Sequence, residues 1–220
     1  MTTIFVAGAT GETGRRVVRS LVNRDITVKA LVRDQSAAKE ILPEGVELVS
    51  ASLGDREALG KVMAGCDGII SATGARPSLD VTGPYKVDCD GTKNLVEAAK
   101  DQGIDKFIMV SSLCVSQFFH PLNLFWLVLY WKLQAEIYLK NSGLTYTIVR
   151  PGGLRNEDAD TPVIMKGADS LFEGGIPRSQ VAEVCAEALS QPDAANKIVE
   201  IVASDDAPQQ AWPELFASVA

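Results

Sequence analysis

The chain has 220 residues, a formal net charge of −7 and 46% hydrophobic residues, which is enough for one sizeable core. The acidic balance argues against nucleic-acid binding, because affinity for a phosphate backbone comes from clustered Lys and Arg. Its four cysteines show no metal-ligand spacing, so neither a metal site nor a disulfide framework is predicted, and a reducing compartment fits best.

Short apolar runs alternate with helical patterns along the chain. The expected strands are Ile4–Ala7, Val28–Val32, Val46–Val49, Gly68–Ser71, Phe107–Val110, Tyr146–Val149 and Ile198–Val202. The expected helices are Glu12–Val22, Arg56–Met63, Thr92–Lys100, Leu122–Lys140 and Gln180–Leu189. This alternation predicts an α/β fold, a doubly wound parallel sheet of Rossmann type in a single domain over residues 1–220. Residues 151–180, where the alternation loosens, are expected to form a small C-terminal lobe for a substrate or partner.

The stretch FVAGATGETG follows the first expected strand and opens the first expected helix. Glycine allows a tight turn and a close approach of the backbone to a pyrophosphate, whose charge lies at the positive end of the helix. A turn without a ligand is the alternative, but the flanking strand and helix supply the context that the motif requires. Cofactor contacts are therefore predicted from Gly8, Thr10, Gly11, Thr13 and Gly14.

The residues after the second strand distinguish NADP from NAD. The motif LVRD places Arg33 ahead of Asp34, and Arg15 follows the third glycine of the loop. Arginine neutralises a 2′-phosphate, whereas an acidic residue accepts a hydrogen bond from the ribose 2′-hydroxyl. The sequence favours NADP, with Arg33 and Arg15 as contacts, unless Arg33 and Asp34 form only a solvated turn.

Later strand ends offer further contacts, because ligands of open α/β sheets bind at the carboxyl ends of the strands. Asp55, after the third strand, could border the adenine. Ala72, Thr73 and Gly74, after the fourth strand, could line the pyrophosphate and ribose. Plain loop turns are the alternative for both segments.

The motifs GATGETG, LVRD, VSS, WKLQAE and YTIVRPGGL together resemble the atypical short-chain dehydrogenase/reductase superfamily. More narrowly, they resemble its NAD(P)H-binding branch of NmrA-like regulators, flavin/biliverdin reductase-type proteins and the NADP-binding component of the chloroplast translocon. This likeness covers almost the whole chain. It implies that Ser111 or Ser112 hydrogen-bonds the nicotinamide or a substrate carbonyl, and that Lys132 contacts the nicotinamide ribose. Ser112 and Lys132 are thus the candidate catalytic residues, with Ser111 and Lys132 also expected to contact the cofactor.

Typical members of the superfamily pair this lysine with a tyrosine four residues earlier, where this chain has Val128. Tyr130 lies about 200° around the helix axis from Lys132 and cannot take that role. Because Lys132 and Glu136 belong to a four-residue repeat of charges, an ordinary charged stripe is the alternative to a ribose contact. His120, the single histidine, suits proton transfer near neutral pH, although a structural role is commoner for such a residue.

No charged residue interrupts the run from Leu124 to Trp131. A helix that is apolar on all sides must be buried in the core, in an interface or against a membrane surface. Polar residues interrupt the preceding stretch, so no transmembrane helix is expected. Residues 122–131 are expected to cap the nicotinamide end of the cleft or to make a peripheral contact with a partner or membrane.

These features leave two main functions. The first is an NADPH-dependent reductase of a small organic substrate, with the proton taken from solvent or a nonstandard donor. The second is a noncatalytic NADP(H)-binding redox sensor or docking module, which the missing tyrosine favours. A sugar-nucleotide epimerase also needs that tyrosine and ranks last.

Both ends of the chain bear on its location and partners. A strand begins almost at the first residue, which leaves no room for a signal peptide, so a cytoplasmic location is expected. Translocon-type relatives carry a long Ser/Pro-rich extension for binding ferredoxin–NADP reductase, and this chain ends at Ala220 without one. That partnership is therefore not expected, and a small-molecule substrate or another redox protein is left open.

Overall fold

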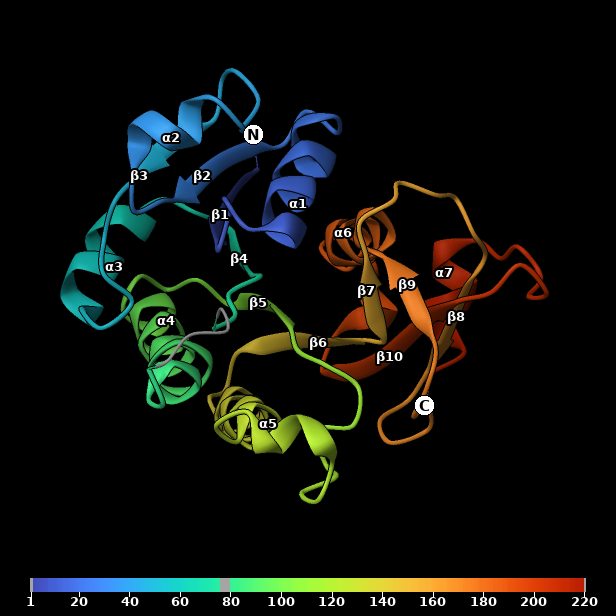
Figure 1. Cartoon of the computed structure of the whole chain (residues 1–220). Coiled ribbons are helices and arrows are strands. Elements are labelled where there is room, and N and C mark those ends of the chain that lie inside the picture. Colours follow the sequence, from blue (N-terminus) through green and yellow to red (C-terminus); the bar gives the residue numbers. More distant parts are fainter. Residues whose placement is uncertain (1, 76–79, 220) are drawn as a thin grey trace.

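The computed structural model describes residues 2–75 and 80–219. Within them lies an eight-stranded sheet with the order β3-β2-β1-β4-β5-β6-β10-β8 (Figure 1). Its strands are β1 Thr3–Ala7, β2 Thr27–Leu31, β3 Glu47–Val49, β4 Gly68–Ser71, β5 Lys106–Val110, β6 Thr145–Pro151, β8 Val163–Lys166 and β10 Lys197–Ala203. All neighbours pair in parallel except the edge strand β8, which is antiparallel to β10. The predicted doubly wound sheet is confirmed, with one antiparallel edge added.

Helices cover both faces of this sheet (Figure 1). On one face α1 (Glu12–Val22) packs against α6 (Arg178–Glu187), and on the other lie α3 (Arg56–Met63), α4 (Gly91–Asp101) and α5 (Val128–Lys140). Successive side chains of β1 enter different cores: Ile4 and Val6 join the first cluster, and Phe5 and Ala7 the second. A strand buried on both faces has to be apolar throughout, which explains the continuous apolar runs of the sequence.

The strand order reverses at the centre of the sheet, where β1 lies between β2 and β4. Ligands of doubly wound sheets bind beyond the carboxyl ends of the strands at such a reversal. The loop after β1 and the segment after β4 meet there, because the amide of Ala72 donates to the carbonyl oxygen of Ala7. The topology therefore brings the glycine motif to residues 72–74.

Helix α5 begins at Val128, not at Leu122 as predicted. Residues Pro121–Leu124 form the short 3-10 helix η2, and Trp126 and Leu127 then adopt left-handed backbone angles, with φ of 57° and 58°. The side-chain oxygen of Asn123 accepts from the amides of the second and third residues of α5 and so closes its first turn. This cap is made by a residue well upstream of the helix, so helical periodicity placed the start too early.

Several short elements have no clear periodicity and were not predicted. They are α2 (Gln35–Lys39), the π-helix η1 (Tyr85–Asp90), the 3-10 helix η3 (Pro192–Ala194), β8 and α7 (Trp212–Ala217). Residues 151–180 contain a parallel pair of strands, β7 (Gly153–Arg155) and β9 (Gly175–Pro177), and contribute β8 to the main sheet. Ile176 of β9 is fully buried in the same hydrophobic cluster as α1 and α6, so this segment shares the core of the sheet.

Candidate functional site

The loop between β1 and α1 needs glycine at two positions for its own packing. Gly8 has a φ of 77°, and a Cβ atom there would lie 2.5 Å from the carbonyl oxygen of Ala72. A Cβ atom on Gly14 would lie 2.0 Å from the carbonyl oxygen of Gly8. At Gly11 a Cβ atom would meet only the Gly8 oxygen, at 3.2 Å, so the space beside Gly11 is open to a ligand.

The amino end of α1 has the properties of a pyrophosphate site. Gly11 is its N-cap residue and supplies no side-chain acceptor, so the first-turn amides have no cap within the described chain. Thr10 is half-buried and Thr13 buried, and neither hydroxyl is hydrogen-bonded to a described residue. Free amides at the positive end of a helix bind phosphate oxygens, and the missing Cβ at Gly11 permits their approach. The loop therefore fits a dinucleotide.

The two charged residues after β2 have different roles. Asp34 caps α2, and its Oδ1 atom accepts from the amides of Ser36 and Ala37 at 2.9 and 3.1 Å. Arg33 is exposed and forms no ion pair with any described residue. The carboxylate that would select NAD is therefore already used, whereas the Arg33 guanidinium is available for an anion.

Arg15, the second predicted cation, is less available. Its Nη2 atom lies 2.7 Å from Oε2 of Glu12, and the same carboxylate oxygen accepts from Arg16 at 3.0 Å. The hydrogen bond from Arg16 is the main cause of the lowered pKa of Glu12. Glu12 thus stays ionised and holds Arg15 beside the first turn of α1.

The segments after β3 and β4 also have different roles, because one caps a helix and the other borders the glycine loop. Asp55 caps α3, with its Oδ1 atom accepting from the amide of Ala58 at 2.9 Å. After β4, Ala72 packs against Gly8, and the Thr73 hydroxyl lies 3.0 Å from the Ser71 hydroxyl. Gly74 is exposed. Residues 72–74 therefore border the glycine loop, while Asp55 has a capping role that the sequence reading did not include.

Lys132 projects from α5 toward the end of β4. Its Nζ atom donates to Oδ1 of Asp88 at 2.6 Å, and a Cβ atom on Gly74 would lie 4.0 Å from Nζ. Asp88 is buried, and its second oxygen accepts from the amide of Ala75 at 3.2 Å. The lysine is thus fixed beside the segment predicted to line the ribose. The sequence reading missed Asp88, and a carboxylate among buried positions before α4 was the only signal for it.

Glu136 and Lys132 do not belong to a solvated stripe, so that alternative was wrong. Glu136 is 1% exposed and accepts from Arg150 at 2.7 Å and from the Ser111 hydroxyl at 2.5 Å. The Ser111 hydroxyl is therefore directed to Glu136. Ser112, half-buried, has no hydrogen bond to a described residue, and its hydroxyl is free to meet a substrate.

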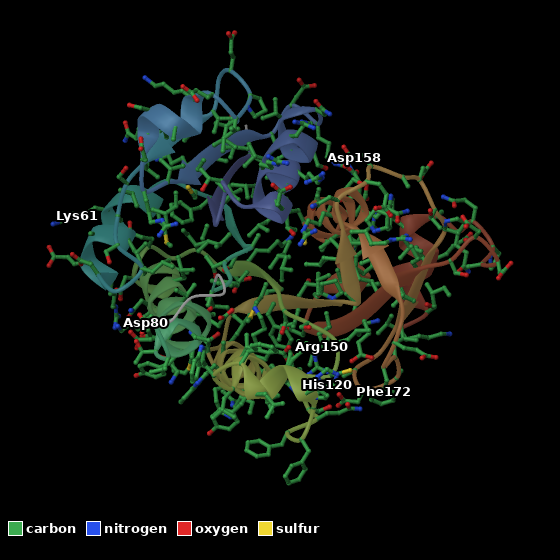
Figure 2. The ribbon with its side chains drawn as sticks, viewed as in Figure 1. Lys61, Asp80, His120, Arg150, Asp158 and Phe172 are labelled. Carbon is green, nitrogen blue, oxygen red and sulfur yellow. The ribbon has the colours of Figure 1, made fainter. Side chains whose placement is uncertain are left out.

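Arg150, labelled in Figure 2, lies at the centre of a largely buried network that reaches Ser111 through Glu136. Besides Glu136 it contacts Glu200 at 3.2 Å and Asp169 at 3.0 Å. Burial acts to lower the pKa of Arg150, but the hydrogen bonds with Glu136 and Glu200 outweigh it, and the pKa is raised. Glu200 also accepts from three successive amides, at residues 169–171. The network joins α5, β6 and β10 to the loop after β8.

His120 and Tyr130, in the segment after β5, contact neighbouring residues of the same segment and of α5. The Nδ1 atom of His120 accepts from the amide of Leu122 at 3.2 Å and so caps η2. Tyr130 packs edge-on against Phe118 and Trp131. Val128 occupies the position where the superfamily resemblance places a tyrosine. His120 and Tyr130 therefore both make structural contacts in the described chain.

Comparison with known proteins identifies the family. A family model described as NAD(P)H-binding matches residues 8–192. The chain belongs to this NAD(P)H-binding family. An uncharacterised chloroplastic protein of Arabidopsis thaliana is 46% identical over 98% of this chain and 82% of its own length. Protein TIC 62 of Pisum sativum, also chloroplastic, is 38% identical over 93% of this chain but only 43% of its own length.

One further relative and one solved structure extend the comparison. Sanguinarine reductase of Eschscholzia californica is 29% identical over 90% of this chain and 88% of its own length. A structure titled putative NAD-dependent epimerase/dehydratase, from Bacillus halodurans, superposes with a TM-score of 0.88 at 28% identity and covers 99% of both chains. These relatives confirm the predicted resemblance to the atypical dehydrogenase/reductase branch. The glycine loop and the residues after β4 lie within the matched range.

The described residues contain neither a candidate membrane span nor a candidate metal site. No helix among residues 2–75 and 80–219 is long and apolar enough to cross a membrane. In the same part of the chain, no group of three His, Cys, Asp or Glu side chains could hold a metal ion. Several relatives are named as chloroplastic, and the compartment of this chain stays a prediction.

Proposed function

We propose that this chain is an NADPH-dependent reductase of a small organic substrate. The observation that carries the proposal is the pairing of Lys132 with buried Asp88 beside Gly74, which fixes a cation at the predicted ribose position. A bound nicotinamide cofactor would supply the hydride. The first turn of α1 would hold the pyrophosphate, Lys132 the ribose hydroxyls, and Ser112 a substrate carbonyl. With Val128 in place of tyrosine, the proton would come from solvent.

Activity can be tested by following NADPH oxidation by the purified chain with quinones, flavins and aldehydes as acceptors. We expect turnover with at least one acceptor class, reduced by Ser112→Ala and nearly unchanged by Tyr130→Phe. A Tyr130→Phe variant without turnover would show that α5 is read in the wrong register and that Tyr130 is the proton donor.

NADP preference is the finer part of the proposal. It is supported by Arg33, which has no ion pair with a described residue, and by the capping role of Asp34. A charge-assisted bond from Arg33 to a 2′-phosphate contributes about 1.5–3 kcal/mol. We therefore expect Arg33→Ala to weaken NADPH binding by about 10- to 100-fold in titration calorimetry and to leave NADH binding unchanged. Lys39→Ala, which removes another exposed cation from α2, is the matched control. Equal affinity of the unmodified chain for both cofactors would contradict the proposal.

A noncatalytic NADP(H)-binding redox sensor or docking module is the second candidate. Val128 and the exposed apolar segment before α5 favour it. Tight cofactor binding without turnover of any acceptor would support this candidate over the reductase. The chain spans less than half the length of TIC 62, so the partners of that protein do not form part of the proposal.

A further inference from the structure

Exposed apolar side chains concentrate in one short segment. Of thirteen large hydrophobic side chains exposed among the described residues, seven lie in residues 118–127, here called the apolar tip. They are Phe118, Phe119, Leu122, Leu124, Phe125, Trp126 and Leu127. Phe119 is 95% exposed and Leu124 84% exposed. The sequence predicts burial of residues 124–131 in the core, in an interface or against a membrane, but the described part of the chain leaves the tip exposed.

The tip projects from the body of the molecule between β5 and α5 (Figure 1), and aromatic side chains extend beyond the ribbon at this end (Figure 2). A row of aromatic rings in edge-to-face contact connects the tip to α5. Phe119 packs on Phe118 with ring centroids 5.4 Å apart, Phe118 on Tyr130 at 6.0 Å, and Tyr130 on Trp131 at 5.0 Å. The base of the tip is therefore packed onto α5, which keeps the outer side chains directed outward.

The backbone of the tip largely satisfies its own hydrogen bonds. The side-chain amide of Asn123 donates to the carbonyl oxygen of Phe118, and its oxygen accepts from the first-turn amides of α5. The amide of Leu122 donates to His120, and those of Phe125 and Leu127 donate to preceding carbonyl oxygens. Unpaired backbone groups cost several kcal/mol each in hydrocarbon. Internal pairing of this kind allows the tip to enter lipid without that cost.

The apolar tip and the residues on both sides of it carry no charged side chain. No Lys, Arg, Asp or Glu occurs from Leu113 to Trp131, while the whole chain carries a net charge of −7. A charged group would oppose insertion into lipid, and the net charge opposes approach to an anionic lipid surface. Both features favour an electrically neutral bilayer.

We infer that the apolar tip inserts into the interfacial region of a neutral lipid bilayer. Seven exposed apolar side chains lie within ten consecutive residues that carry no charge for pairing with a protein partner, whereas fluid lipid accommodates such side chains without a preformed shape. Trp and Phe are well suited to the depth of the headgroup boundary. Since α5 carries Lys132 one helical turn beyond Val128, this attachment would bring the proposed ribose contact of Lys132 close to the membrane surface.

The test uses the full chain with sucrose-loaded phosphatidylcholine vesicles. We expect co-sedimentation with the vesicles and a blue shift of tryptophan emission that is lost in Trp126→Phe. Phe119→Ser and Phe125→Ser should each weaken vesicle partitioning about tenfold, because each removes a large exposed apolar area that lipid would cover. Ile41→Ser, which removes an exposed apolar side chain just after α2, is the matched control and should bind vesicles like the unmodified chain.

Three outcomes would overturn this inference. The first is no binding to phosphatidylcholine vesicles, and the second is vesicle binding unaffected by Phe119→Ser and Phe125→Ser. The third is concentration-dependent dimerisation without lipid that these substitutions abolish while vesicles have no effect, which would make the tip a contact between two copies of the chain. Cofactor affinity measured on each variant shows that the fold is intact, and it is a readout independent of reductase activity.

Discussion

Lys132 and Asp88 stabilise each other, and one substitution affects both folding and binding. The carboxylate of Asp88 is 1% exposed and lies 2.6 Å from the lysine nitrogen. Lys132→Met keeps much of the side-chain volume but leaves a buried carboxylate without its cation. We expect the free energy of unfolding in urea to fall by about 1.5–3 kcal/mol, and cofactor affinity in calorimetry to fall as well.

Asp88→Asn in the Lys132→Met background separates these two effects. An amide needs no cation, so the double variant should regain much of the lost stability. Cofactor affinity should stay low, because the ribose contact is attributed to the lysine itself. Recovery of affinity together with stability would show that Lys132 serves only to neutralise Asp88.

At the scale of elements, the glycines in the turn from β1 into α1 have different roles. Gly8 and Gly14 are needed for folding, whereas Gly11 leaves space for a ligand. Gly11→Val should fold normally and lose cofactor binding, because its branched side chain would occupy the open space over the first turn. Gly14→Ala places a Cβ atom against the backbone of Gly8 and should destabilise the fold by about 1–3 kcal/mol or more. Circular dichroism and calorimetry distinguish the two. Retained affinity in a folded Gly11→Val variant would mean that the glycines only form a turn.

At the scale of the whole molecule, the Arg150 network connects elements that are distant in sequence. Arg150→Met would leave Glu136 and Glu200 as buried carboxylates without a cation. We expect the free energy of unfolding to fall by about 3–5 kcal/mol in urea denaturation. Arg155→Met breaks only the exposed ion pair with Glu157 and should cost less than about 1 kcal/mol. Similar losses in both variants would mean that the network adds little to stability.

The buried thiols predict how stability depends on pH. Burial raises the pKa of Cys185 to about 12, whereas an unfolded thiol ionises near 8.5. Above ~8.5 the unfolded state binds fewer protons, so the free energy of unfolding falls as pH rises, by up to about 1.4 kcal/mol per unit, until the folded thiol ionises. Cys185→Ala should make the fall between about pH 8 and about pH 10 smaller by roughly 2 kcal/mol in urea denaturation. An unchanged pH slope would contradict this.

Local pattern was sufficient for the elements with strong periodicity. The bounds of α1, α3 and β4 agree with those predicted. An amphipathic repeat or a short apolar run shows directly which consecutive residues form an element with a buried face. The glycine loop was recognisable for the same reason, since the strand, turn and helix around it are contiguous in the chain. The fold and the family likeness could therefore be read without coordinates.

The partners of the polar residues depend on contacts between distant segments, which periodicity does not report. Lys132 meets Asp88 from 44 positions away, and Arg150 meets Glu200 from 50 positions away. Charged residues inside the apolar runs of β6 and β10 signalled a need for partners without saying which. The apolar run before α5 was equally ambiguous, because hydrophobicity alone is the same for a core helix and for an exposed tip. Only the packing of β5, Asn123 and α5 leaves those side chains facing outward.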